Sequence, residues 1–108
     1  MKIAVIIPTY NERENIVYLL DQLAVATKPL MHHQFTFIVV DDTSPDGTAD
    51  VVNIYRKKHP NTVLMTGKKE GLGKALLRGM AHAIDELGAD AIAQIDADLS
   101  HDPKMFPR

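Results

Sequence analysis

The sequence predicts an α/β fold, an open and mostly parallel sheet with helices on both faces. Short β-branched apolar runs alternate along the chain with segments whose apolar residues recur at three- and four-residue spacing. The runs are apolar on both faces, as parallel strands covered by helices require. With 108 residues, 45% of them hydrophobic, the chain has enough apolar mass for one core. Residues 1–108 are therefore expected to belong to a single domain.

The first strand and helix are expected directly at the N-terminus. Lys2 to Pro8 is apolar on both faces, which indicates a central strand. A helix is expected from about Glu12 to Ala26, because apolar residues then recur at helical spacing. Asn11 offers a side-chain oxygen as N-cap, and Glu14 three residues later completes a pair that resembles a capping box.

The remaining elements continue the alternation of strands and helices. Further strands are expected at Phe35 to Val40, Val63 to Thr66 and Ala91 to Ile95. Further helices are expected at about Thr48 to Lys58 and at Leu72 to Leu87. Gly88 follows the last helix where a C-terminal cap belongs, and right-handed crossovers would make the sheet parallel.

Composition and charge narrow the classes of function. The net charge of −2 comes from mixed signs without a long like-charge run, which does not favour a nucleic-acid partner. The absence of cysteine excludes a disulfide framework and a thiolate nucleophile, and suits a cytoplasmic location. No apolar run approaches the ~20 residues of a membrane helix. Membrane contact is therefore expected only through other segments or partner subunits.

Polar side chains follow three of the expected strands, at the end where an open α/β sheet binds its ligands. These segments are Pro8 to Glu12, Asp41 with Asp42, and Asp96 to Asp98. Each alone has an ordinary structural interpretation, such as a helix cap or a turn. Tyr10 can stack on a base or cover the core edge, and Glu12 can accept hydrogen bonds or favour a helix start. Three such segments at one sheet edge favour a ligand site.

Asp96 and Asp98 carry the most specific chemistry. Two carboxylates this close repel each other unless they bind a proton or a cation. Carboxylate oxygens suit Mg²⁺ or Mn²⁺, which also take ligands from substrate phosphates. A metal–diphosphate site is the natural interpretation, although Asp-x-Asp also occurs in surface loops. The Lys68 to Lys74 segment fails the phosphate-loop and dinucleotide-binding templates, which leaves a basic helix start or a solvated turn.

Four motifs together resemble the family 2 glycosyltransferases of GT-A fold (the nucleotide-diphospho-sugar transferase type), in both order and spacing. They are Pro8-Thr9-Tyr10-Asn11-Glu12, Asp41-Asp42 with Ser44-Pro45-Asp46-Gly47-Thr48, Gly71-Leu72-Gly73, and Asp96-Ala97-Asp98-Leu99-Ser100-His101. The resemblance is strongest to the polyprenyl-phosphate branch, the dolichyl-phosphate mannosyltransferases and their prokaryotic relatives. It covers essentially the whole chain.

The resemblance implies inverting transfer of mannose from GDP-mannose to a polyprenyl (dolichyl) phosphate, with Mg²⁺ or Mn²⁺, at the cytoplasmic face of a membrane. The implied nucleotide-sugar-binding residues are Pro8, Tyr10, Glu12, Val40, Asp42, Asp96, Ala97 and Asp98. Asp96 and Asp98 would be the metal-binding and catalytic residues, with Asp98 as the first choice of direct ligand. The acceptor phosphate is anionic at neutral pH, so a dedicated general base is not required.

The chain departs from the family pattern at Thr43, where relatives often have Gly or Asn, and in its length. It ends at Arg108, before further metal ligands and an acceptor-binding segment, so we expect a truncated N-terminal part with little activity alone. One alternative is a family 2 enzyme that uses a UDP-sugar and a saccharide acceptor. Another is a non-enzymatic receiver-like signalling module, whose Mg²⁺ site Asp41, Asp42 and Asp96 would mimic.

Overall fold

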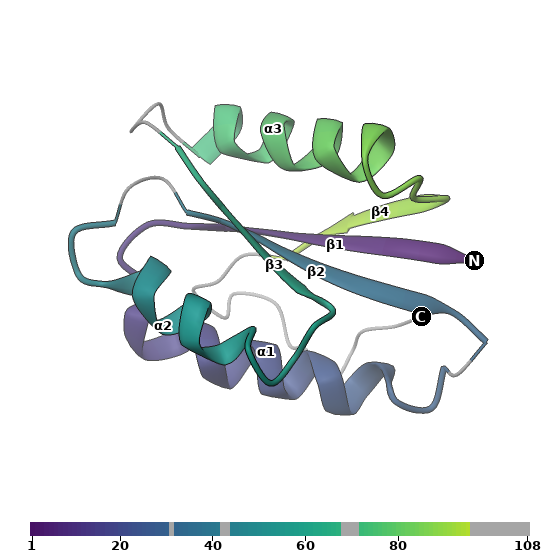
Figure 1. The fold of residues 1–108 in the computed structure, drawn as a ribbon, viewed down its shortest axis with the longest axis horizontal. Helices are drawn as coiled ribbons and strands as arrows, with labels where there is room; N and C mark the ends of the chain where they lie inside the picture. Colours follow the sequence, from purple (N-terminus) through teal and green to yellow (C-terminus); the bar gives the residue numbers. More distant parts are fainter. Residues whose placement is uncertain (31, 42–43, 68–71, 96–108) are drawn as a thin grey trace.

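The computed structural model describes residues 1–30, 32–41, 44–67 and 72–95, and places a parallel sheet between two layers of helix (Figure 1). The strands are β1 (Lys2–Thr9), β2 (Gln34–Asp41), β3 (Thr62–Thr66) and β4 (Ala91–Gln94). The helices are α1 (Arg13–Thr27), α2 (Thr48–Tyr55) and α3 (Leu72–Asp85). This order confirms the predicted fold class. α2 and α3 end two to three residues before the predicted bounds.

The strand order is β3-β2-β1-β4, with every pair parallel. β1 is central, as predicted, and pairs with β2 over its whole length, from Lys2 opposite Gln34 to Thr9 opposite Asp41. β2 and β3 lie on one side of β1 while β4 lies on the other, so the strand order reverses between β1 and β4. Ligands of open α/β sheets bind in the crevice that such a reversal opens.

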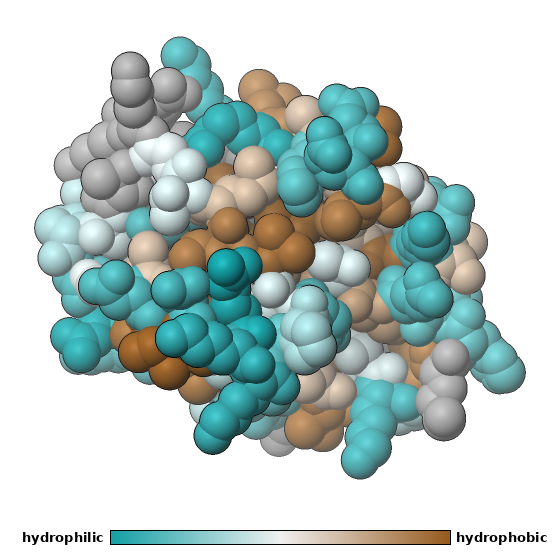
Figure 2. Space-filling model, viewed as in Figure 1, coloured by the Kyte–Doolittle hydropathy of each residue, from teal (hydrophilic) through white to brown (hydrophobic). Residues whose placement is uncertain are grey.

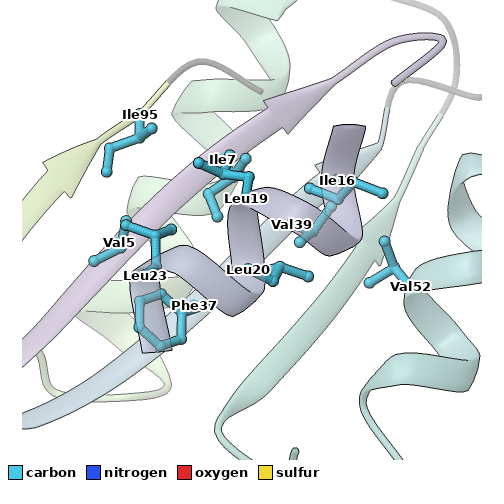
Figure 3. Packing of buried hydrophobic residues seen from close by; sticks show 10 residues of the cluster. All are labelled: Val5, Ile7, Ile16, Leu19, Leu20, Leu23, Phe37, Val39, Val52 and Ile95. Atoms are coloured by element: carbon cyan, nitrogen blue, oxygen red, sulfur yellow. The ribbon is translucent and has the colours of Figure 1, made fainter. Parts of the chain in front are cut away.

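One face of the sheet is covered by α1 and α2. Alternate residues of β1 and β2, among them Val5, Ile7 and Phe37, point toward α1 (Figure 3). They meet the buried leucines of α1 at positions 19, 20 and 23 and Val52 of α2. Each fully buried side chain of this kind contributes about 1.5–3 kcal/mol. The larger of the two core clusters therefore holds α1 against the face of the sheet formed by β1 and β2.

The opposite face is covered by α3, which packs on the other set of alternate residues, including Ile6 and Val40. Gly79 makes a close approach possible, because a Cβ there would lie 2.9 Å from a γ-carbon of each of these two residues. Gly88 follows α3 with a φ of +62°, which confirms the predicted C-terminal glycine. Figure 2 shows apolar surface where β3 runs between α2 and α3, because residues 63–65 of this edge strand are only partly buried.

The predicted cap of α1 is wrong. The N-cap residue is Glu12 rather than Asn11, and it makes no side-chain capping bond. Asn11 instead has a φ of +56°, in the left-handed region, so it turns the chain between β1 and α1. The acceptors that cap α1 come from the loop after β2.

Candidate functional site

The carboxyl ends of the parallel strands lie along one edge of the sheet. Asp41 at the end of β2 is opposite Thr9 of β1 and Thr66 of β3. After β4, the amide of Ile95 donates to the carbonyl of Ile6 on β1, at 3.1 Å. The turn after β1 and the loop after β2 therefore start side by side, as predicted. Residues 96–98, which carry the third predicted segment, lie outside the described residues.

Asp41 is a buried anchor of this edge, with 1% of its surface exposed. Its Oδ1 accepts hydrogen bonds from the hydroxyls of Thr9, at 2.7 Å, and Ser44. Its Oδ2 accepts from the amide of Ser44 at 2.9 Å. Three hydrogen bonds to one buried carboxylate hold it in a single orientation. Asp41 thus shapes the loop, and it is not exposed as the Mg²⁺ ligand that a receiver-like module requires.

Three consecutive amides at the start of α1 donate to side chains of the loop after β2. The pairs are Asn11 to Ser44 Oγ at 2.9 Å, Glu12 to Thr48 Oγ1 at 3.1 Å, and Arg13 to Asp46 Oδ2 at 3.2 Å. The first amides of a helix have no partner within the helix. Here the neighbouring loop supplies those partners, so the turn and the loop form one hydrogen-bonded unit.

Asp46 occupies the position where a helix N-terminus attracts an anion. Its Oδ1 accepts from the amide of Thr48, at 3.0 Å, and from the Thr48 hydroxyl. Burial acts to raise the pKa of Asp46, but these bonds, the Arg13 amide and the Arg13 charge outweigh it and lower that pKa below its ordinary value. Dinucleotide-binding folds keep this helix start free for a pyrophosphate. In this chain the Asp46 side chain fills that position, so the helix start is not open to a pyrophosphate.

The lowered pKa of Asp46 predicts a loss of stability in acid. Because the folded-state pKa lies below the unfolded value, the contribution is complete above about pH 4 and is lost as pH falls through the folded pKa. Asp46→Asn is expected to lower the urea midpoint at pH 7, with a smaller difference from wild type at pH 3. Asp50→Asn, at an exposed position of α2, is the control. A difference for Asp46→Asn that is the same at both pH values would contradict the assignment.

Four of the predicted site residues lie at or near the end of β1 and β2. Pro8 is buried and opposite Val40 in the strand register, while Tyr10 and Glu12 are half-buried in the turn that follows β1. Glu12 Oε2 accepts from the side-chain amide of Asn15 at 3.3 Å. The side chain of Val40 is fully buried against α3, so a ligand here would meet only its backbone. The other predicted residues, Asp42, Asp96, Ala97 and Asp98, lie outside the described residues.

Arg78 is a candidate that the sequence reasoning missed. Its guanidinium packs on Gly67, and Nη1 donates to the carbonyl of Thr66 at 3.3 Å, at the end of β3. Its Nε and Nη2 are buried and have no hydrogen-bond partner among the described residues. A cation so placed offers two further donors to an anion at this edge. The sequence did offer one signal for Arg78. It is a charged residue next to Gly79, and Gly79 lies on the side of the amphipathic helix α3 that faces the sheet.

The described residues can be compared with the predicted metal and membrane contacts. Within the described ranges, no three His, Asp or Glu side chains form a group that could hold a metal ion. The predicted ligands Asp96 and Asp98 lie outside those ranges. Among the helices α1 to α3, none is long and apolar enough to cross a bilayer.

The sequence model of Glycosyl transferase family 2 matches residues 4–108. The chain belongs to glycosyl transferase family 2. The predicted family is therefore confirmed, and membership of an enzyme family counts against the receiver-like signalling module. The strand order agrees, because the flavodoxin-like order of receiver domains places the third strand beside the first, whereas here β3 lies beyond β2.

This family 2 chain is similar to known mannosyltransferases. It is 39% identical to the dolichol-phosphate mannosyltransferase of Pyrococcus furiosus over 108 residues, which is 100% of the chain and 29% of that relative. The solved mannosyltransferase PcManGT from Pyrobaculum calidifontis, in complex with GDP-Man and Mn²⁺, matches with a TM-score of 0.72 and 30% identity. The match covers 89% of this chain and 27% of that one.

A solved structure in complex with another nucleotide-sugar matches to a similar degree. S. aureus TarS 1–349 in complex with UDP-GlcNAc has a TM-score of 0.69 and 32% identity, over 91% of this chain and 27% of that one. These structures confirm the predicted GT-A fold. The chain spans less than a third of each of these three proteins.

Proposed function

We propose that this chain is the N-terminal, nucleotide-sugar-binding part of a glycosyltransferase that transfers mannose from GDP-mannose to a polyprenyl phosphate, with inversion. The observation that carries this assignment is the arrangement of the strand ends. Two hydrogen-bonded polar loops follow β1 and β2, and β4 pairs with β1 and ends two residues before the Asp96–Asp98 motif. The similarity to a dolichol-phosphate mannosyltransferase supports the choice of sugar and acceptor.

The loops after β1 and β2 bind the nucleoside in this proposal. Tyr10 stacks on the base, and the carboxylates of Glu12 and Asp42 accept hydrogen bonds from base and ribose. Pro8 and the Val40 backbone form the floor between them. Guanine offers two adjacent donors, N1–H and the 2-amino group, to a carboxylate, whereas uracil offers only N3–H. Carboxylates at this edge therefore favour GDP over UDP.

The Asp96-Ala97-Asp98 motif binds the diphosphate in this proposal, with Asp96 and Asp98 as ligands of Mg²⁺ or Mn²⁺. A divalent ion bound there neutralises charge on the departing nucleoside diphosphate. The Mn²⁺ present in the related mannosyltransferase supports this choice of metal. The acceptor phosphate is itself the nucleophile, and the enzyme's task is to align it with the sugar.

The assignment is tested by calorimetric titration of the chain with GDP and with UDP, each with and without Mn²⁺. We expect GDP to bind more tightly than UDP, and we expect binding to require Mn²⁺. Asp98→Ala should weaken GDP binding by more than about tenfold. Asp85→Ala, at an exposed position near the end of α3, should bind GDP like wild type.

Two results would change the assignment. A preference for UDP would move the chain to the UDP-sugar branch of the family, the alternative that the similarity to TarS supports. Binding of neither nucleotide by the folded chain would contradict the assignment of residues 1–108 as the donor-binding part.

A further inference from the structure

We propose that Ser44, Asp46 and Thr48 are positioning residues for the donor nucleotide. Their side chains, the loop clasp, lock the turn after β1 to the loop after β2, so that both loops form a single preformed surface. The inference rests on the proposed function, because it assigns to these residues the placement of Tyr10 and Glu12. None of the three needs to touch the nucleotide.

Ser44 connects a buried anchor to a strained turn. Its hydroxyl donates to Asp41 Oδ1 and accepts from the amide of Asn11 at 2.9 Å. Asn11 has a φ of +56°, in the left-handed region, which asparagine adopts more readily than other non-glycine residues but less readily than glycine. Because Asp41 is itself fixed by Thr9, the Ser44 hydroxyl transmits that rigidity to Asn11. The turn at Asn11 sets the direction of its neighbours in the chain.

Thr48 and Asp46 hold the next two residues of the turn. Thr48 Oγ1 accepts from the amide of Glu12 at 3.1 Å, and Asp46 Oδ2 accepts from the amide of Arg13 at 3.2 Å. Thr48 is fully buried and begins α2, which is seated in the core through Val52. The amide of Glu12 is therefore attached to the first residue of a packed helix, and the amide of Arg13 to the loop just before it, which gives the turn a rigid support.

The consequence is a donor site that is ordered before the nucleotide arrives. Loops that become ordered only on binding lose conformational entropy at that moment, which weakens the complex. Removal of a clasp hydroxyl should therefore weaken nucleotide binding although the residues that contact the nucleotide are unchanged. It should also leave the amide that donated to this hydroxyl open to exchange with solvent.

The experiment combines amide hydrogen exchange with GDP titration in the presence of Mn²⁺, on wild type, Ser44→Ala and Thr48→Val. We expect faster exchange at the amide of Asn11 in Ser44→Ala and of Glu12 in Thr48→Val. GDP affinity should fall by about tenfold in each. Ser44→Thr and Thr48→Ser keep the hydroxyls and should restore both readouts. Thr27→Val is the control, because it removes a hydroxyl that donates to Leu23 at the other end of α1.

A double-mutant cycle separates positioning from a general loss of stability. In a Tyr10→Ala background, Ser44→Ala should reduce GDP affinity by a smaller factor than in wild type, because the residue it positions is absent. The positioning role of the loop clasp would be overturned, and the proposed function left intact, by either of two results. One is an equal loss of GDP affinity in both backgrounds, and the other is unchanged amide exchange at residues 11–13. Failure of the folded wild-type chain to bind GDP or UDP would overturn the proposed function as well.

Discussion

Asp41→Ala is expected to lower the free energy of unfolding by about 3 kcal/mol. The substitution removes three hydrogen bonds to a buried carboxylate. It leaves the buried Thr9 hydroxyl without the acceptor that it has in the wild type, and an unsatisfied buried donor costs about 1–3 kcal/mol. Urea unfolding followed by circular dichroism measures the change.

Two further variants make the Asp41 result specific. Asp41→Asn retains an oxygen for Thr9 but turns an NH₂ group toward the Ser44 amide. The free energy of unfolding should therefore fall by about 2 kcal/mol, less than for the alanine variant. Asp85→Ala, at an exposed position, should change stability by less than about 0.5 kcal/mol. An Asp41→Ala value as small as that of Asp85→Ala would show that Asp41 is not the anchor.

Gly79→Val is expected to lower the free energy of unfolding by about 2–3 kcal/mol, because the interface between α3 and the sheet has no space for a side chain. Even a single Cβ would lie 2.9 Å from Cγ2 of both Ile6 and Val40. Those side chains belong to the sheet core and are fully buried, so they can yield only by displacing their neighbours. Thermal and urea unfolding of the variant measure the loss.

Gly73 provides the matched control on the same helix. A Cβ at Gly73 meets no atom within 4 Å, so Gly73→Ala should gain about 0.5–1 kcal/mol from reduced backbone freedom. Gly79→Ala has the same helix-propensity gain but must displace Ile6 and Val40, so it should destabilise. Equal stabilisation by both alanine substitutions would show that α3 does not pack as closely as described.

Much of the fold could be predicted from the sequence because each element is specified by neighbours within a few residues of one another. The apolar run of β1 and the three- and four-residue spacing along α1 both indicate their elements without reference to the rest of the chain. The start of α1 could not be predicted in this way. Its hydrogen-bond partners come from the next loop. Ser44 and Asp46 each lie 33 positions beyond the residue whose amide donates to them.

The candidate site was predictable as a location and less so as a set of roles. Parallel strands bring their carboxyl ends to one edge, which places Tyr10, Glu12 and Asp41 at that edge. The role of Asp41 depends on burial, and burial follows from its register between Thr9 and Thr66 on neighbouring strands. No local pattern reports that register, just as none reports that α3 covers the side chain of Val40.

By itself, the sequence determined the alternation of strands and helices, the parallel class of the sheet and the family, because periodicity and motif spacing are local or linear properties of the chain. Only the tertiary structure decided that β4 lies beside β1, that Asp41 anchors the edge, and that Asp46 fills the start of α1. Each of these depends on atoms from segments distant in sequence. Their contacts are set by packing around one core, which no single segment encodes.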